Sequence, residues 1–167
     1  MSVPKLLSSL SAYLTRAEEL DKDNSNPDSK IMAFSLRRYV MEKAIQTKTK
    51  DPEVGQFLGD LMTQLEKDKK SINISETDRA IVCEKFAFQV FSKADEEDRA
   101  GLANKGTART FNVARYFFDI LEQFGELSEE VRLTYYYLLY THLIVYAYPI
   151  FCIHISYMLG AREEDIC

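Results

Sequence analysis

The chain has 167 residues, of which 46% are apolar and 28% are charged, an ordinary balance for a folded globular protein. Its net charge of -5 argues against a nucleic-acid-binding surface, because contacts with phosphates require a basic face. The only histidines are His142 and His154, so residues 1–141 offer no imidazole for a triad, a general base or a metal site. We therefore expect no catalytic residues, no metal and no cofactor.

The cysteines and the N-terminus indicate a cytoplasmic protein. Cys83, Cys152 and Cys167 form no CxxC pair and no even framework, which is typical of reduced cysteines. The N-terminal segment MSVPKLLSSL lacks the basic start and apolar core of a signal peptide. We expect a cytoplasmic location.

Three helices are predicted in the first part of the chain. Apolar residues recur at spacings of three and four from Leu6 to Leu20, and the polar segment 21–29 then predicts a turn. A second helix is predicted over 29–47, with apolar positions on more than one stripe, as in a helix with two neighbours. The third begins after Asp51, which can cap it.

Two more helices are predicted after Ser75, which opens a capping arrangement. Between them stands Gly101-Leu-Ala-Asn-Lys-Gly-Thr107, whose two glycines resemble a phosphate-binding loop. Such a loop needs a preceding strand and a lysine after its second glycine, but here helices flank it and Thr107 takes that place. We expect Gly101 to end one helix and Asn104 to cap the next.

Residues 133–159 contain no Asp, Glu, Lys or Arg and hold seven of the ten tyrosines. Three interpretations stay open for this segment. It is long enough for a membrane-spanning helix, although its tyrosines and Pro149 lie inside the run. It could instead be a further helix of the second bundle, or an alternative coding end without an evolved function.

Helices joined by short loops predict an all-α fold of tandem three-helix bundles, the second with an atypical C-terminal helix. The predicted divisions are residues 1–72 for the first bundle, 73–132 for the first two helices of the second, and 133–167 for the apolar, tyrosine-rich tail.

The string "ADEEDRAGLANKGTARTFNVARYFFDILEQFGEL" resembles the Vta/LIP family of endosomal sorting cofactors, which stimulate the ESCRT AAA ATPase. "YLTRAEELDKDN", "AFSLRRYVMEKAI" and "FLGDLMTQLEKDKKSI" resemble the N-terminal region of that family in the same order, so the resemblance covers residues 4–131. It implies tandem MIT modules and a non-enzymatic adaptor of multivesicular-body sorting that binds the C-terminal tails of ESCRT-III subunits. The sequence departs from the family after "GELSEEV", where the family has a charged helix.

The resemblance also implies a binding site in the groove between helices two and three of the first module. The wall from helix three would be Leu58, Met62, Leu65 and Lys69, with Glu66 on its rim; Phe111, Phe118 and Leu121 are further candidates in the second module.

The implied partners are ESCRT-III tails, and the AAA ATPase only where the family's C-terminal domain is present. Recruitment to endosomal membranes would occur through these partners. The alternative function is a membrane-anchored helical protein that inserts through residues 133–159.

Overall fold

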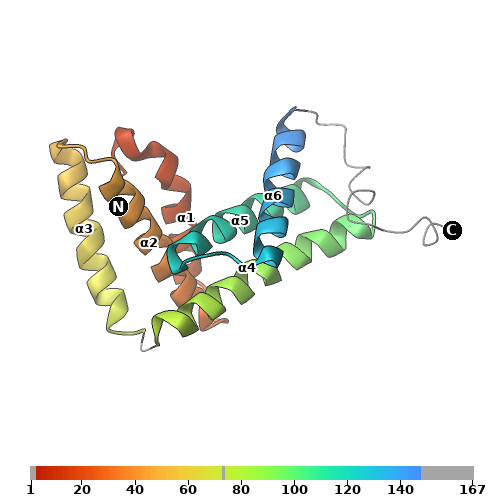
Figure 1. Cartoon of the computed structure of the whole chain (residues 1–167), viewed down its shortest axis with the longest axis horizontal. Helices are drawn as coiled ribbons and strands as arrows, with labels where there is room; N and C mark the ends of the chain where they lie inside the picture. Colours follow the sequence, from red (N-terminus) through yellow and green to blue (C-terminus); the bar gives the residue numbers. More distant parts are fainter. Residues whose placement is uncertain (1–2, 73, 148–167) are drawn as a thin grey trace. The chain divides into compact units, whose positions relative to one another are not determined.

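The computed structural model describes residues 3–72 and 74–147, and within these ranges it contains helices and no strands (Figure 1). The prediction of an all-α fold is confirmed. Two short 3-10 helices, labelled η, accompany six α-helices in the described ranges. In chain order the elements are η1 (Lys5–Leu10), α1 (Ser11–Asp21), α2 (Asp28–Gln46), α3 (Pro52–Lys69), α4 (Glu76–Arg99), α5 (Lys105–Asp119), η2 (Ile120–Phe124) and α6 (Glu129–Ala147).

Side-chain caps explain where α3, α4 and α5 begin. Asp51, Ser75 and Asn104 each accept a hydrogen bond from a backbone N–H of the following first turn, at 2.8, 3.0 and 2.6 Å respectively. Each bond satisfies a donor that the start of a helix leaves without a backbone partner. All three caps were predicted from the sequence and are confirmed.

The loop between α4 and α5 is a helix end followed by a helix start. Gly101 has a φ of +69°, and its N–H bonds to the carbonyl of Asp98 at 2.9 Å, while the Leu102 N–H bonds to the carbonyl of Glu97 at 3.0 Å. This pair of bonds is a Schellman motif, which favours glycine at the left-handed position. The buried Thr107 hydroxyl donates to the Glu97 carboxylate at 2.7 Å. The predicted helix end at Gly101 is confirmed. The hydroxyl of Thr107 forms a hydrogen bond within the protein, between the start of α5 and the end of α4.

The chain divides into two compact units, which are described separately below. Unit 1 comprises residues 1–87 and 116–127. In it, α1 and α3 both pack against α2. Because α2 has neighbours on several sides, most of its circumference is buried. Its buried residues are Ser29, Met32, Ala33, Phe34, Ser35, Leu36, Arg37, Tyr39, Val40 and Ala44.

Residues 116–127 complete unit 1 through contacts with α1 and α2. The Tyr13 hydroxyl donates to the Asp119 carboxylate at 2.7 Å, in a buried position. The Gln123 side chain donates to the backbone carbonyl of Ser35 at 3.1 Å. Ile120 is fully buried as well. The first three helices therefore share their core with a segment that follows them in sequence by more than 40 residues.

Unit 2 comprises residues 88–115 and the chain from residue 128 onward. Here the ring of Tyr137 on α6 packs against Phe91 of α4 and Phe111 of α5, with centroids 5.8 and 6.2 Å apart. Val131 and Leu138 of α6 are buried. The described part of the tyrosine-rich segment is therefore a bundle helix, one of the three interpretations that the sequence left open.

α6 runs across the predicted division between residues 132 and 133. In the ranges that the structure describes, no helix combines the length and the apolar character needed to cross a membrane. Residues 148–159, the remainder of the segment considered as a membrane anchor, lie outside the described residues. The predicted division of the chain at residue 72 stays a prediction.

Candidate functional site

α3 presents one apolar side to the bundle. Val54, Phe57 and Leu61 are buried, and all three fall within the first ten residues of the helix. Their spacing of three and four places them on one face, the pattern of a helix that packs on a core. This face fixes the rotation of α3 about its own axis.

A second, more exposed set of residues lies beside that face. Leu58 and Leu65 are half-buried, whereas the side chain of Met62 is 57% exposed. Glu66 and Lys69 are exposed. The spacing of four, three and four from Leu58 to Lys69 brings these residues to one side of the helix, with Glu66 at its edge. We call these five residues the α3 stripe.

The α3 stripe combines an accessible apolar strip with charges of both signs at its end. Such a surface costs free energy in water, and exposed apolar surface rimmed by polar residues is typical of protein-binding sites. α2, which packs against α3, also exposes one large apolar side chain, Ile45, near the end that leads into α3. The sequence predicts apolar positions on more than one stripe of this helix and gave no sign that Ile45 would be exposed.

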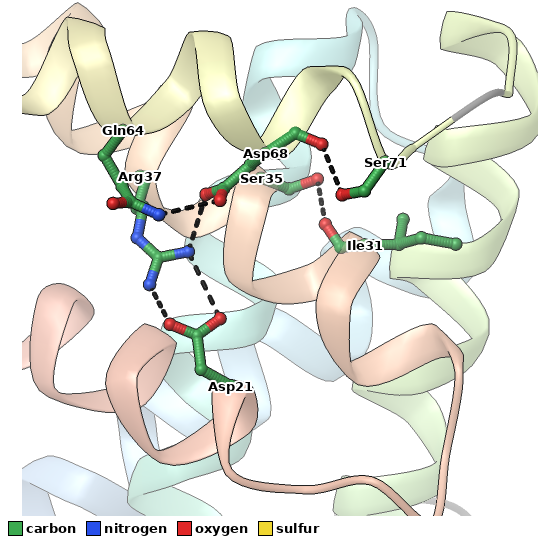
Figure 2. A network of polar contacts seen from close by, with 7 residues as sticks. All are labelled: Asp21, Ile31, Ser35, Arg37, Gln64, Asp68 and Ser71. Atoms are coloured by element: carbon green, nitrogen blue, oxygen red, sulfur yellow. Dashed lines mark hydrogen bonds and ion pairs between the residues drawn. The ribbon is translucent and has the colours of Figure 1, made fainter.

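Beneath α3, Arg37 of α2 lies at the centre of a polar network (Figure 2). Its guanidinium pairs with Asp21 at the end of α1 and, at 2.9 Å, with Asp68 of α3. Gln64 donates to the second oxygen of Asp68 at 2.7 Å. The side chain of Arg37 is only 6% exposed, so one buried cation connects three helices. Sequence reasoning missed this residue, since a charged residue on a helix is ordinarily exposed.

A small hollow of about 250 Å³ adjoins this network on the side of α1. It is lined by Leu14, Glu18, Asp21, Arg37 and Gln64. Its lining contains no member of the α3 stripe, because Gln64 and the stripe lie on different flanks of the helix.

The candidates predicted for the second module have different environments. Phe111 is half-buried in unit 2, where its ring packs against Phe91 with centroids 5.9 Å apart. Phe118 and Leu121 are buried core residues of unit 1. Neither of the latter two presents a surface to a partner in this structure.

No group of three potential metal ligands occurs among the described residues. Cys83, the cysteine in the part of the chain that the structure describes, donates from its Sγ to the Ser35 hydroxyl at 3.2 Å. Burial raises the pKa of the Cys83 thiol to about 11, although the Ser35 hydrogen bond opposes the shift. Because the thiolate is the reactive form, this cysteine is structural in character.

Comparison with known proteins gives a match over most of the chain. The family model described as "Vta1 like" matches residues 9–144. The chain is 43% identical over 126 residues to the Arabidopsis thaliana homolog of mammalian LYST-interacting protein 5, which covers 72% of the chain and 28% of that relative.

Vacuolar protein sorting-associated protein VTA1 homologs are also similar. The one from Dictyostelium discoideum is 37% identical over 138 residues, 79% of the chain and 24% of the relative. The one from Homo sapiens is 34% identical over 133 residues, 77% of the chain and 42% of the relative. The chain thus spans less than half the length of these relatives. Since the family model covers both units, the chain belongs to the Vta1-like family.

Proposed function

We propose that the chain is a non-enzymatic adaptor module of endosomal, multivesicular-body sorting, which binds the C-terminal tails of ESCRT-III subunits through the α3 stripe. The names of the relatives support the sorting role, since two of the three relatives named above are vacuolar protein sorting-associated proteins. Recruitment from the cytoplasm to endosomes would follow from binding of the tails. Engagement of the AAA ATPase is proposed only for proteins that also carry the family's C-terminal domain.

The observation that carries the proposal is the graded exposure along the α3 stripe. Met62 projects into solvent between the half-buried Leu58 and Leu65. A tail helix that lays its apolar residues along this strip would cover all three side chains, as in helix-in-groove recognition. Methionine suits such a position, because its flexible thioether adapts to the shape of the ligand.

The charged residues at the end of the stripe would set the register of the tail. Glu66 and Lys69 are exposed and lie one turn apart, so they can meet a basic and an acidic group of the ligand. Charges at the rim of an interface contribute more to orientation and to the rate of association than to affinity. The apolar contacts are therefore expected to carry most of the binding free energy.

The test is a calorimetric titration with synthetic peptides that carry ESCRT-III C-terminal tails. Met62→Asp and Leu65→Asp should each weaken binding at least 30-fold, about 2 kcal/mol or more, because each places a charge in the centre of the apolar strip. Far-ultraviolet circular dichroism should show unchanged helicity, particularly for the exposed Met62. Unchanged affinity of both variants would refute the assignment of the site.

Leu6→Asp is the matched control. Leu6 is 65% exposed and lies in unit 1 outside the α3 stripe, so the same change of leucine to aspartate should leave binding of the tails unaffected. A loss of affinity in this variant would mean that added negative charge, rather than the position of the substitution, weakens binding.

A further inference from the structure

The two halves of α3 are held to unit 1 in different ways. The buried apolar residues Val54, Phe57 and Leu61 all lie within the first ten of its 18 residues, and the remaining residues, 62–69, are called its second half below. Residues 62–69 contain no buried side chain. The second half therefore has little apolar anchorage, yet it carries Leu65, the most C-terminal apolar residue of the α3 stripe.

An ion pair supplies the anchorage that the second half lacks. Asp68 is one turn from Leu65 and next to Lys69, and its Oδ2 accepts from the Arg37 guanidinium at 2.9 Å (Figure 2). The side chains of Arg37 and Asp68 are 6% and 19% exposed, so water screens this pair only weakly. Gln64, one turn before Asp68, holds the other carboxylate oxygen at 2.7 Å.

The second carboxylate on Arg37 serves a different helix. Asp21 stands at the end of α1, and its side chain is 44% exposed. The planar guanidinium can bind both carboxylates at once, which a lysine ammonium at the end of a flexible chain does less well. The pair with Asp21 thus connects Arg37 to α1, and the pair with Asp68 anchors the second half of α3.

We propose that Arg37 is a positioning residue for the tail-binding surface: through Asp68 it fixes the second half of α3 and hence the place of Leu65 and Lys69. Arg37 touches no tail itself, because it is buried beneath the helix. The influence on binding rests on the proposed function, whereas the anchoring of α3 can be measured without any ligand.

The experiment compares Asp68→Asn with Asp21→Asn, since both remove one negative charge from the same arginine and keep the shape of the side chain. Amide hydrogen exchange followed by NMR reports on the anchoring. In Asp68→Asn, protection of the amides of residues 65–69 should fall by roughly tenfold or more, while that of residues 57–61 stays near the wild-type value. In Asp21→Asn both sets should stay protected.

Titration with the ESCRT-III tail peptides reports on the consequence for binding. Asp68→Asn should weaken binding by about 3- to 30-fold, the range common for changes that act from outside a contact surface. Asp21→Asn should bind as the wild type does. Arg37→Met should lose both affinity for the tails and protection of residues 65–69. Arg37→Lys should retain part of each, because its ammonium can still pair with one carboxylate.

The outcomes separate the two proposals. Unchanged exchange at residues 65–69 in Asp68→Asn, or an equal loss in Asp21→Asn, would overturn the positioning role of Arg37. Lowered protection with unchanged affinity would show that the anchored half of α3 does not set binding, which overturns it as well. If the wild type binds no tail while Asp68→Asn still loosens residues 65–69, the proposed function fails and the anchoring stands.

Discussion

At the scale of single residues, Arg37 and Arg38 show that the sequence does not predict which of two adjacent arginines is buried. They are adjacent and chemically identical, but the first is buried between three helices and the second pairs with Glu76 of α4 near the surface. The guanidinium of Arg38 lowers the pKa of Glu76, whose side chain is 60% exposed. The string "SLRRYV" cannot say which arginine turns inward, because that depends on where α1 and α3 lie.

The same scale includes a prediction for Cys83. Its pKa of about 11 is two units above the ordinary value of 9.0, so at pH 8 its thiolate fraction is about a hundredfold lower than that of an exposed cysteine. We expect iodoacetamide at pH 8 to alkylate Cys83 at least a hundredfold more slowly than an exposed cysteine. A Cys152→Ser/Cys167→Ser variant leaves Cys83 as the one cysteine to be followed. Mass spectrometry over time measures the rate.

The sign of the pH dependence follows from the raised pKa. The folded state keeps the proton on Cys83 between about pH 9 and 11, whereas the unfolded chain loses it, so the free energy of unfolding should fall as pH rises through this window. Cys83→Ala removes this contribution and serves as the control. Alkylation of Cys83 at the rate of a free thiol under native conditions would contradict its burial.

At the scale of secondary-structure elements, the starts of helices were predictable and their subdivision was not. Asp51, Ser75 and Asn104 cap helices through local hydrogen bonds, which depend only on neighbours in sequence. The 3-10 geometry of η1 and η2 was not foreseen, since the apolar spacing of these segments continues into α1 and out of α5. The spacing of apolar residues does not distinguish a short 3-10 segment from one more turn of α-helix.

The candidate site was predictable to a similar extent. The spacing from Leu58 to Lys69 predicts that these residues share one side of a helix, and in the structure all of them belong to α3. Their graded exposure, and the burial of Phe118 and Leu121, depend on which elements cover each helix. Sequence alone does not contain that information.

Two glycines offer a test at the level of the element. A Cβ added at Gly101 or at Gly59 would meet no atom within 4 Å, so crowding is absent at both positions. Gly101→Ala should nevertheless cost about 1 kcal/mol of stability, because its φ of +69° is unfavourable for a residue with a Cβ. Gly59→Ala, inside α3, should stabilise by about 0.5–1 kcal/mol.

Urea denaturation followed by circular dichroism measures both changes. Gly59→Ala is the matched control, because the same methyl group is added in a right-handed helical position. Changes of the same sign in the two variants would show that backbone conformation is not the deciding factor.

At the scale of the whole molecule, the units do not follow the order of the helices. Unit 1 takes residues from two separate stretches of chain, and α4 and α5 each contribute residues to both units. Within unit 1, the Phe34 ring of α2 stacks on Arg79, which also lies over the ring of Phe124, with distances of 5.3 and 5.8 Å. Within unit 1, α1 and α2 thus contact the segment 116–127, and α2 also contacts the first part of α4.

This arrangement predicts that residues 1–72 alone are much less stable than residues 1–127. The shorter fragment exposes Phe34 and leaves the buried Tyr13 hydroxyl and the Ser35 carbonyl without Asp119 and Gln123. We expect a loss of roughly 3 kcal/mol or more, about the contribution of one or two buried aromatic side chains. Urea denaturation of both fragments measures the difference.

The fragment of residues 1–127 controls for the absence of α6, since it contains all of unit 1. Equal unfolding midpoints for the two fragments would establish residues 1–72 as an independent module, as the sequence pattern predicted. A lower midpoint for the shorter fragment would show that the later residues belong to its stable core.

The chain crosses from one unit to the other three times, after residues 87, 115 and 127. During synthesis, the first helices therefore leave the ribosome well before the segment that closes their core. Unit 1 reaches its full set of contacts only when residue 127 has emerged, so Phe34 and Tyr13 lack part of their native contacts until then. A chimaera that takes one unit from a relative would likewise need three fusion points, after residues 87, 115 and 127, rather than one.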